Sequence, residues 1–258
     1  MQNATYRELE ARWKSLRRSR DDVAVREVAC VNAPRTLLCV EVGNPALPCI
    51  ALSAGVHGDE PAGPAALLRL AESGALDRRY AYRIWPCTNP SGYDARTREN
   101  VDGLDVNRTF GRGGQSPEAR AIVTSNRNRK FALSIDLHED RDAAGFYCYE
   151  YGGGELGVAV VAAIDRAGLP VDSLVALDLG SPLALKVMTV QRGRITADHR
   201  AEGAVVGGLS YSLLLARGAA ARVLTHETPG AHAWEARLSM HEIAVTAAID
   251  ALSQGFHK

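Results

Sequence analysis

The sequence lacks an excess of charge of either sign, because 30 lysine and arginine residues balance 30 aspartate and glutamate residues in a chain of 258. A neutral chain without a long basic run has no electrostatic reason to bind nucleic acid or an anionic membrane surface. No stretch approaches the roughly 18 apolar residues that a membrane-spanning helix requires. We therefore expect neither nucleic acid nor membrane as a partner, and a small substrate that local residues select.

Cysteine is sparse and unpatterned. The chain contains five cysteines, an odd number, and no two of them form a CxxC pair. This pattern argues against a thiolate zinc knuckle and a disulfide framework. The N-terminal stretch, residues 1–20, lacks the apolar segment of a secretion signal and predicts a polar helix. A cytoplasmic protein with reduced cysteines is the expectation.

Strand-like apolar runs alternate with helix-like segments along the whole chain, and no repeat or linker divides it. Ser116, followed by Pro117 and Glu118, is typical of a helix start. This alternation predicts one domain over residues 1–258, a three-layer α/β/α sandwich around a mixed, largely parallel central sheet. Strands are expected at 23–32, 35–43, 49–55, 80–87, 131–138 and 221–227, and helices at 61–74, 117–130, 155–168 and 233–253.

Polar residues gather where the predicted strands end. His57, Asn89, His138 and Glu227 each stand at or just past such an end. In open α/β sheets, ligands bind at the carboxyl ends of the strands. Residues 88–116 form a long, polar, glycine-rich stretch, and stretches of this length more often belong to a functional site. The sequence therefore places a site at one edge of the sheet.

His57 and Glu60 are three residues apart in His-Gly-Asp-Glu, a spacing that lets both side chains point the same way on a turn. A catalytic zinc ion typically takes three protein ligands from histidine and carboxylate, and His138 would be the third. Each residue alone also has an ordinary explanation. Glu60 fits a carboxylate that opens a helix, and His138 fits a strand-end histidine bonded to backbone.

The order of the motifs along the chain decides between these interpretations. The motifs are HGDE (57–60), NPSGY (89–93), RENVDGLDVNRTFG (98–111), SPEAR (116–120), SIDLHED (134–140) and LTHETPG (224–230). This series resembles the zinc carboxypeptidases of the M14 class and the related succinylglutamate desuccinylase/aspartoacylase group, over roughly residues 50–230. The resemblance implies a single zinc-carboxypeptidase-like catalytic domain.

The resemblance assigns roles to individual residues. It implies that His57, Glu60 and His138 bind one zinc ion per chain, that Glu227 is the general base, and that Arg98 stabilises the oxyanion.

It also implies that Asn107 and Arg108 receive a free carboxylate of the substrate and that Asp105 orients a ligand histidine. Tyr211 matches a substrate-binding tyrosine, although its helical surroundings equally suggest an aromatic that packs in a helix.

Neighbouring strand residues point to opposite faces, so His226 beside Glu227 and Glu139 beside His138 are not expected to reach the metal. The remaining histidines have no partners at ligand spacing and are predicted to lie at the surface: His199, His232, His241 and His257.

The leading hypothesis is a zinc metallocarboxypeptidase that acts on a small peptide with a free carboxylate. The alternative is an N-acyl-amino-acid deacylase of the desuccinylase/aspartoacylase type, and a non-enzymatic alternative is a catalytically silent protein that binds zinc and peptide. Residues that set the side-chain preference are expected within 185–225, where the resemblance is poorest.

Overall fold

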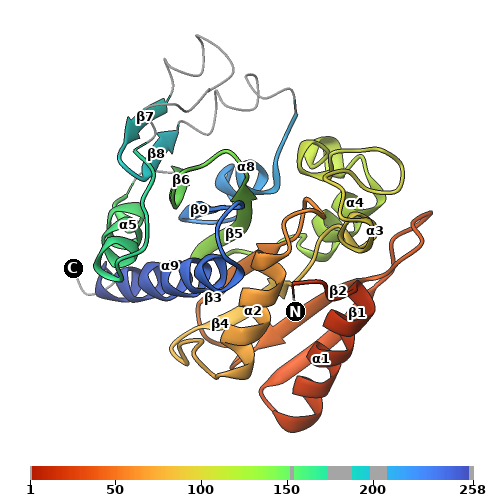
Figure 1. Ribbon diagram of the computed structural model, residues 1–258. Helices are drawn as coiled ribbons and strands as arrows, with labels where there is room; N and C mark the ends of the chain where they lie inside the picture. Colours follow the sequence, from red (N-terminus) through yellow and green to blue (C-terminus); the bar gives the residue numbers. More distant parts are fainter. Residues whose placement is uncertain (1, 152–153, 174–187, 198–207, 256–258) are drawn as a thin grey trace.

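The computed structural model describes residues 2–151, 154–173, 188–197 and 208–255, and it shows a three-layer α/β fold (Figure 1). In the described part of the chain, one nine-stranded sheet has the order β1-β2-β4-β3-β5-β9-β6-β8-β7. Its strands are β1 (Val23–Val28), β2 (Leu37–Val42), β3 (Cys49–Ala54), β4 (Ala81–Trp85), β5 (Leu133–Asp140), β6 (Tyr147–Tyr151), β7 (Met188–Gln191), β8 (Arg194–Ala197) and β9 (Val223–Pro229).

The centre of the sheet is parallel. Strand β3 pairs in parallel with both β4 and β5, and β5 pairs in parallel with β9. Antiparallel pairs extend the sheet on both sides, through β1 and β2 at one end and through β6 and β7 at the other. The predicted fold class, a mixed sheet with a parallel centre, is confirmed.

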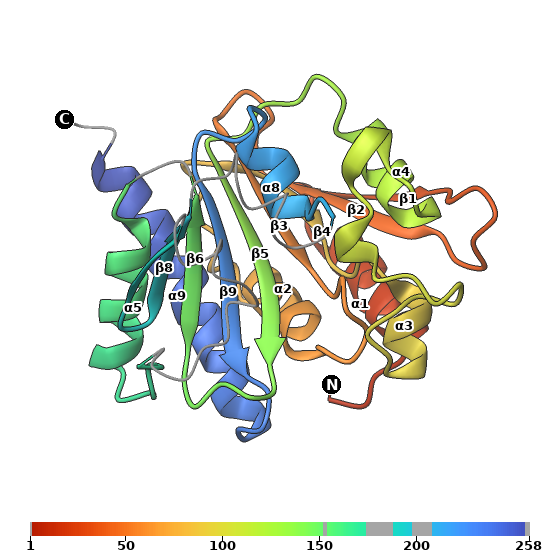
Figure 2. The ribbon, with the colours of Figure 1, turned by 90° about the horizontal axis from the view of Figure 1, so that it is seen from above.

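Helices cover both faces of the sheet (Figure 2). On one face, α9 (Trp234–Gly255) packs against α2 (Ala62–Glu72) and α5 (Leu156–Arg166), and α1 (Tyr6–Ser19) packs against β1 and α2. On the other face, α8 (Tyr211–Ala216) contacts β5 and β9, and α4 (Pro117–Ser125) lies beside it. No described helix has the length and apolar character that crossing a membrane demands.

Alternate residues of the central strands belong to different cores. Leu133, Ile135 and Leu137 of β5 join the apolar cluster beneath α2, α5 and α9. Val223 of β9 joins the second cluster, on the face of α8 and α4. Since side chains alternate along a strand, this burial fixes which face every other residue of β5 and β9 occupies.

Several local predictions are confirmed. Helix α1 lies within the predicted segment 1–20, and Thr5 forms a capping box with Glu8 at its start. The Ser116 side chain accepts a hydrogen bond from the Ala119 amide and caps α4, as its sequence predicts. The five cysteines, all within the described residues, are free.

The polar stretch 88–116 contains short regular elements, namely α3 (Pro90–Ala95) and two 3-10 turns, Val106–Arg108 and Gly111–Gly113. The sequence pattern also does not predict β6, β7 and β8. Each of these strands has only four or five residues and carries polar side chains, so its apolar signal is weak.

Candidate metal centre and cleft

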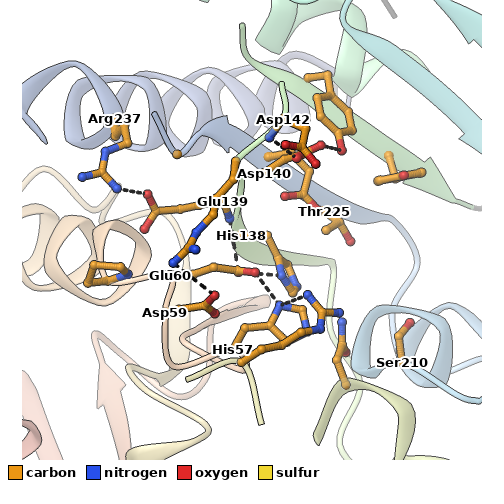
Figure 3. Close-up of a pocket in the computed structure, with 18 of the residues that line it drawn as sticks. His57, Asp59, Glu60, His138, Glu139, Asp140, Asp142, Ser210, Thr225 and Arg237 are labelled. Atoms are coloured by element: carbon orange, nitrogen blue, oxygen red, sulfur yellow. Dashed lines mark hydrogen bonds and ion pairs between the residues drawn. The ribbon is translucent and has the colours of Figure 1, made fainter. Parts of the chain in front are cut away.

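A cleft of about 630 Å³ opens where β3, β5 and β9 end (Figure 3). His57 follows β3, His138 lies near the end of β5, and Glu227 lies near the end of β9. His138 and Glu227 are direct partners in the β5–β9 register, so their side chains share one face of the sheet. The predicted convergence of strand-end residues is therefore present in the fold.

His57, Glu60 and His138 form a buried cluster in this cleft. One possible ligand atom from each lies within 4.8 Å of the other two. Glu60 contacts both histidines: its Oε1 is 2.5 Å from Nδ1 of His57, and its Oε2 is 3.0 Å from Nδ1 of His138. Two imidazole nitrogens and a carboxylate facing a common point are a donor set that fits zinc and also accepts other divalent transition metals.

The opposite ring nitrogens of the two histidines face other carboxylates. Nε2 of His57 is 3.4 Å from Oδ1 of Asp105, and Nε2 of His138 is 3.2 Å from Oδ2 of Asp136. Asp136 in turn accepts a hydrogen bond of 2.6 Å from the Ser53 hydroxyl. A carboxylate behind a histidine fixes the tautomer and orientation of the ring, which is a common feature of metal sites.

Asp136 is a site residue that the sequence analysis missed. Its signal is its position two residues before His138 on the same strand, which places both side chains on one face. The motif SIDLHED contains three acidic residues. Alternation along β5 excludes Glu139 but leaves Asp140 on the same face as Asp136.

The electrostatics of the cluster are those of a cation site. Burial alone would raise the pKa of Glu60, but His57 and His138 outweigh it and hold that pKa well below its usual range. Burial opposes protonation of His138, yet Glu60 and Asp136 raise its pKa above the ordinary value. Burial also raises the pKa of Glu227; nearby Glu60 adds to this effect and His138 opposes it.

The turn that carries His57 and Glu60 packs closely against the NPSGY motif (89–93). A side chain at Gly58 would collide with the backbone of Gly92, because its Cβ would lie 1.8 Å from the Gly92 carbonyl carbon. Asn89 accepts a hydrogen bond from the Gly92 amide (3.0 Å) and donates one to the Arg98 carbonyl (3.2 Å). The NPSGY motif therefore joins the metal-site turn to the segment that carries Arg98.

Arg98 lies beside the cluster. Its guanidinium donates two hydrogen bonds, of 3.1 and 2.9 Å, to Oδ2 of Asp105, and its Nη1 is 3.4 Å from Nδ1 of His57. Asp105 thus contacts both residues. Burial would raise the pKa of Asp105, but the contacts with His57 and Arg98 hold it well below its usual range.

Asn107 and Arg108 line the same cleft from a 3-10 turn. The Asn107 side-chain oxygen accepts a hydrogen bond of 3.2 Å from the backbone amide of Tyr211, and Nη1 of Arg108 donates one of 3.2 Å to the Asn107 carbonyl. The fold therefore brings the pair to the cleft that contains the His57–Glu60–His138 cluster.

Tyr211 does not join the cleft. Its side chain is buried, its hydroxyl accepts a hydrogen bond of 2.9 Å from Asn126, and its ring centre is 5.1 Å from that of Phe110. The arrangement is that of an aromatic that packs at the start of a helix.

The tyrosines that do line the cleft come from β6: Tyr147, Tyr149 and Tyr151. Their alternate spacing places them on one face, and the sequence analysis missed them because it did not predict this strand. From the segment 185–225, α8 and the residue before it contribute Ser210 and Ser212 to the cleft. Residues 185–187 and 198–207 of that segment lie outside the described residues.

The side chains beside the strand-end residues turn away from the cluster, as the alternation predicts, although Glu139 still lines one side of the cleft. Glu139 accepts a hydrogen bond from the Ala62 amide at the start of α2, and His226 packs edge-on against Phe146.

One prediction about the other histidines is wrong. His241 is fully buried, because α9 presents it to the sheet, where its Nε2 is 3.2 Å from the Thr228 hydroxyl. His232 is partly buried, and His199 and His257 lie outside the described part of the chain.

Comparisons with known proteins agree with this architecture. Residues 46–173 match the sequence model of the succinylglutamate desuccinylase/aspartoacylase catalytic domain. Carboxypeptidase SOL1 of Arabidopsis thaliana is 32% identical over 111 residues, which cover 35% of this chain and 23% of that protein. The chain therefore matches less than a quarter of that relative's length.

Solved structures share the fold. A provisionally assigned metallopeptidase of Shewanella denitrificans superposes with a TM-score of 0.75 at 20% identity, covering 94% of this chain and 88% of that one. A metallo-carboxypeptidase of Burkholderia cenocepacia gives 0.71 at 18% identity, covering 98% and 70%. Bovine thrombin-activatable fibrinolysis inhibitor gives 0.66 at 14% identity, covering 98% of each chain.

At these identities the structural matches establish the fold alone. Together with the sequence matches they agree with the resemblance read from the motifs: residues 46–173 are similar to the succinylglutamate desuccinylase/aspartoacylase catalytic domain, and the chain shares the fold of M14-like metallocarboxypeptidases.

Proposed function

We propose that this protein is a zinc-dependent metallocarboxypeptidase that hydrolyses an amide bond next to a free carboxylate. The observation that carries the proposal is the convergence of the His57–Glu60–His138 cluster, Glu227, Arg98 and Arg108 on one cleft. Each part alone has structural explanations, but their combination supplies every group that metal-assisted amide hydrolysis needs.

In this proposal His57, Glu60 and His138 hold the metal, with His57 oriented by Asp105 and His138 by Asp136. Zinc, when bound, acidifies a water molecule and polarises the scissile carbonyl. Glu227 accepts the proton of the attacking water and later donates it to the leaving amine. Desolvation raises the pKa of Glu227 above that of an ordinary carboxylate, which suits a group that must both take and return a proton.

The two arginines have different tasks because their positions differ. Arg98, beside the metal cluster, stabilises the negative charge that develops on the carbonyl oxygen. Arg108 and Asn107 bind the free carboxylate of the substrate, for which a guanidinium fork is well shaped. A substrate held at Arg108 with its amide bond at the metal is then oriented for attack.

One alternative function has its own support. The matching family model, over residues 46–173, is that of the succinylglutamate desuccinylase/aspartoacylase catalytic domain, which favours an N-acyl-amino-acid deacylase. Both reactions use the same metal, base and carboxylate-binding groups, and they differ in whether the acyl group is a peptide or a small acid.

A substrate panel tests the proposal. The purified protein, with its zinc content measured, is incubated with short peptides and with N-acetyl- and N-succinyl-amino acids. We expect release of the C-terminal amino acid from peptides. Release of acetate or succinate alone would favour the deacylase. Protein that binds zinc tightly but cleaves nothing would refute both reactions and support a silent binding protein.

A further inference from the structure

Glu139 connects the metal cluster to the helices on the other face of the sheet. Through its backbone amide it donates a hydrogen bond of 3.2 Å to Oε2 of Glu60. Through its side chain it accepts a hydrogen bond of 2.6 Å from the Ala62 amide and forms an ion pair with Arg237 of α9. In Figure 3 the Glu139 carboxylate points away from His138 and toward Arg237.

The contact with Ala62 lies where the chain leaves the metal site. Helix α2 begins at Ala62, two residues after Glu60, and Pro61 before it offers no side-chain cap. The first turn of a helix leaves backbone amides without partners, and a carboxylate there is also favoured by the helix dipole. Glu139, which lies on β5, supplies this missing cap to the Ala62 amide. The cap fixes the backbone that follows Glu60.

Arg237 in turn holds Glu139. Both side chains are almost inaccessible, with 8% of Arg237 and 3% of Glu139 exposed. The Arg237 guanidinium also lies over the Trp234 ring, 5.3 Å from its centre. Because two buried charges neutralise each other, loss of either one would leave the other unpaired close to Glu60.

We propose that Glu139 and Arg237 are a positioning pair, which anchors the first turn of α2 to α9 and thereby holds Glu60 in place to bind the metal. The pair itself does not touch the metal. The inference rests on the metal site of the proposed function but not on any particular substrate or reaction.

The chain contains a matched ion pair without a metal ligand beside it. Glu150 of β6 accepts hydrogen bonds from the Leu156 and Gly157 amides at the start of α5 (3.0 and 3.2 Å) and from Nε of Arg194 (2.8 Å). This pair also joins a buried strand glutamate, a helix N-terminus and an arginine. Neither Glu150 nor Arg194 lines the cleft, so the pair serves as an internal control.

Zinc affinity of the folded protein distinguishes positioning from general stability. Glu139→Gln and Arg237→Leu are compared with Glu150→Gln and Arg194→Leu by competition against a chromogenic chelator, at a temperature where circular dichroism shows every variant folded. All four changes are expected to lower the unfolding temperature. We expect only the first two to weaken zinc binding, by about 10- to 100-fold, the range typical of residues that support metal ligands. Unchanged zinc affinity in Glu139→Gln and Arg237→Leu would overturn the proposal.

A double variant keeps the test valid if the single variants do not fold. Glu139→Met combined with Arg237→Met removes both charges, and apolar replacement of a buried ion pair often preserves stability. Weak zinc binding in this folded double variant supports positioning, and wild-type affinity refutes it. If wild-type protein binds zinc but cleaves no substrate, the proposed function fails while this inference stands.

Discussion

Glu227 lies directly opposite Tyr147 in the antiparallel register of β9 and β6, and it is at the same time the register partner of His138 in β5. Tyr147 and His138 therefore flank Glu227 on the same face of the sheet. This position explains the raised pKa of Glu227, since burial is its main cause.

Glu227→Gln is expected to lower kcat by about 100- to 10,000-fold, because the amide keeps the shape of the side chain but cannot carry the proton. Zinc content should remain stoichiometric, since Glu227 is not part of the donor cluster. Glu242→Gln on α9, which removes a carboxylate paired with Arg69 outside the cleft, is the control and should retain activity. A Glu227→Gln variant with wild-type turnover would exclude this residue as the base.

Arg108→Ala is expected to raise KM for substrates with a free carboxylate by about 10- to 100-fold, the loss of one charge-assisted interaction. The effect should vanish for a peptide whose C-terminus is amidated, because that substrate offers no carboxylate to bind. Arg141→Ala, at a cleft arginine whose side chain is 73% exposed, should change KM much less. Equal effects on free and amidated peptides would argue against carboxylate binding by Arg108.

Removal of metal by a chelator is expected to lower the unfolding temperature and abolish activity, and added zinc should restore both. A ligand that binds only the native state stabilises it, by about 2.7 kcal/mol when its concentration is 100 times the dissociation constant. Differential scanning fluorimetry with and without zinc measures the shift. In Glu60→Gln, which weakens the cluster, the shift should be small. A zinc-dependent shift of wild-type size in Glu60→Gln would place the metal elsewhere.

Tyr211→Phe is expected to leave kcat/KM near the wild-type value and to reduce stability by about 1 kcal/mol, because only the hydrogen bond to Asn126 is lost. Steady-state kinetics and urea unfolding measure the two effects. A loss of activity without a loss of stability would show that the hydroxyl reaches the substrate.

The sequence predicts that His57, His138 and Glu227 come together, because one rule covers all three. His57 follows β3, and His138 and Glu227 lie near the ends of β5 and β9; these strands run in parallel, so their carboxyl ends meet at one edge. The three-residue spacing between His57 and Glu60 on a turn predicts that Glu60 points toward the same site. These relationships depend on the direction of the strands and on their order along the chain. The alternation of strand-like apolar runs with helix-like segments predicts both.

The sequence does not predict relationships that depend on which faces pack together. Asp136 supports His138 only because both alternate onto the same side of β5, and His241 is buried only because α9 turns it toward Thr228. The tyrosines of β6 are not predicted as cleft residues, because this short strand has a weak apolar signal. Tertiary packing decides all three cases, and a single sequence carries little information on it.

His226 is expected to make the protein less stable in acid. Its ring is fully buried, both ring nitrogens lack a hydrogen-bond partner within the described structure, and burial lowers its pKa to about 3. In the unfolded chain a histidine has a pKa of about 6.5. Between these two values the unfolded state binds more protons, so the free energy of unfolding falls as the pH falls, by up to about 1.4 kcal/mol per pH unit.

The change His226→Leu removes this titration, and urea unfolding at pH 5 and pH 7.5 measures it. Relative to wild type, the stability lost between the two conditions should shrink by about 1–2 kcal/mol. It should not disappear, because burial also holds the pKa of His241 below its ordinary value. His232→Gln, at a partly buried position outside this contact, is the control. An equal loss of stability in His226→Leu and wild type would show that the buried ring does not govern the acid response.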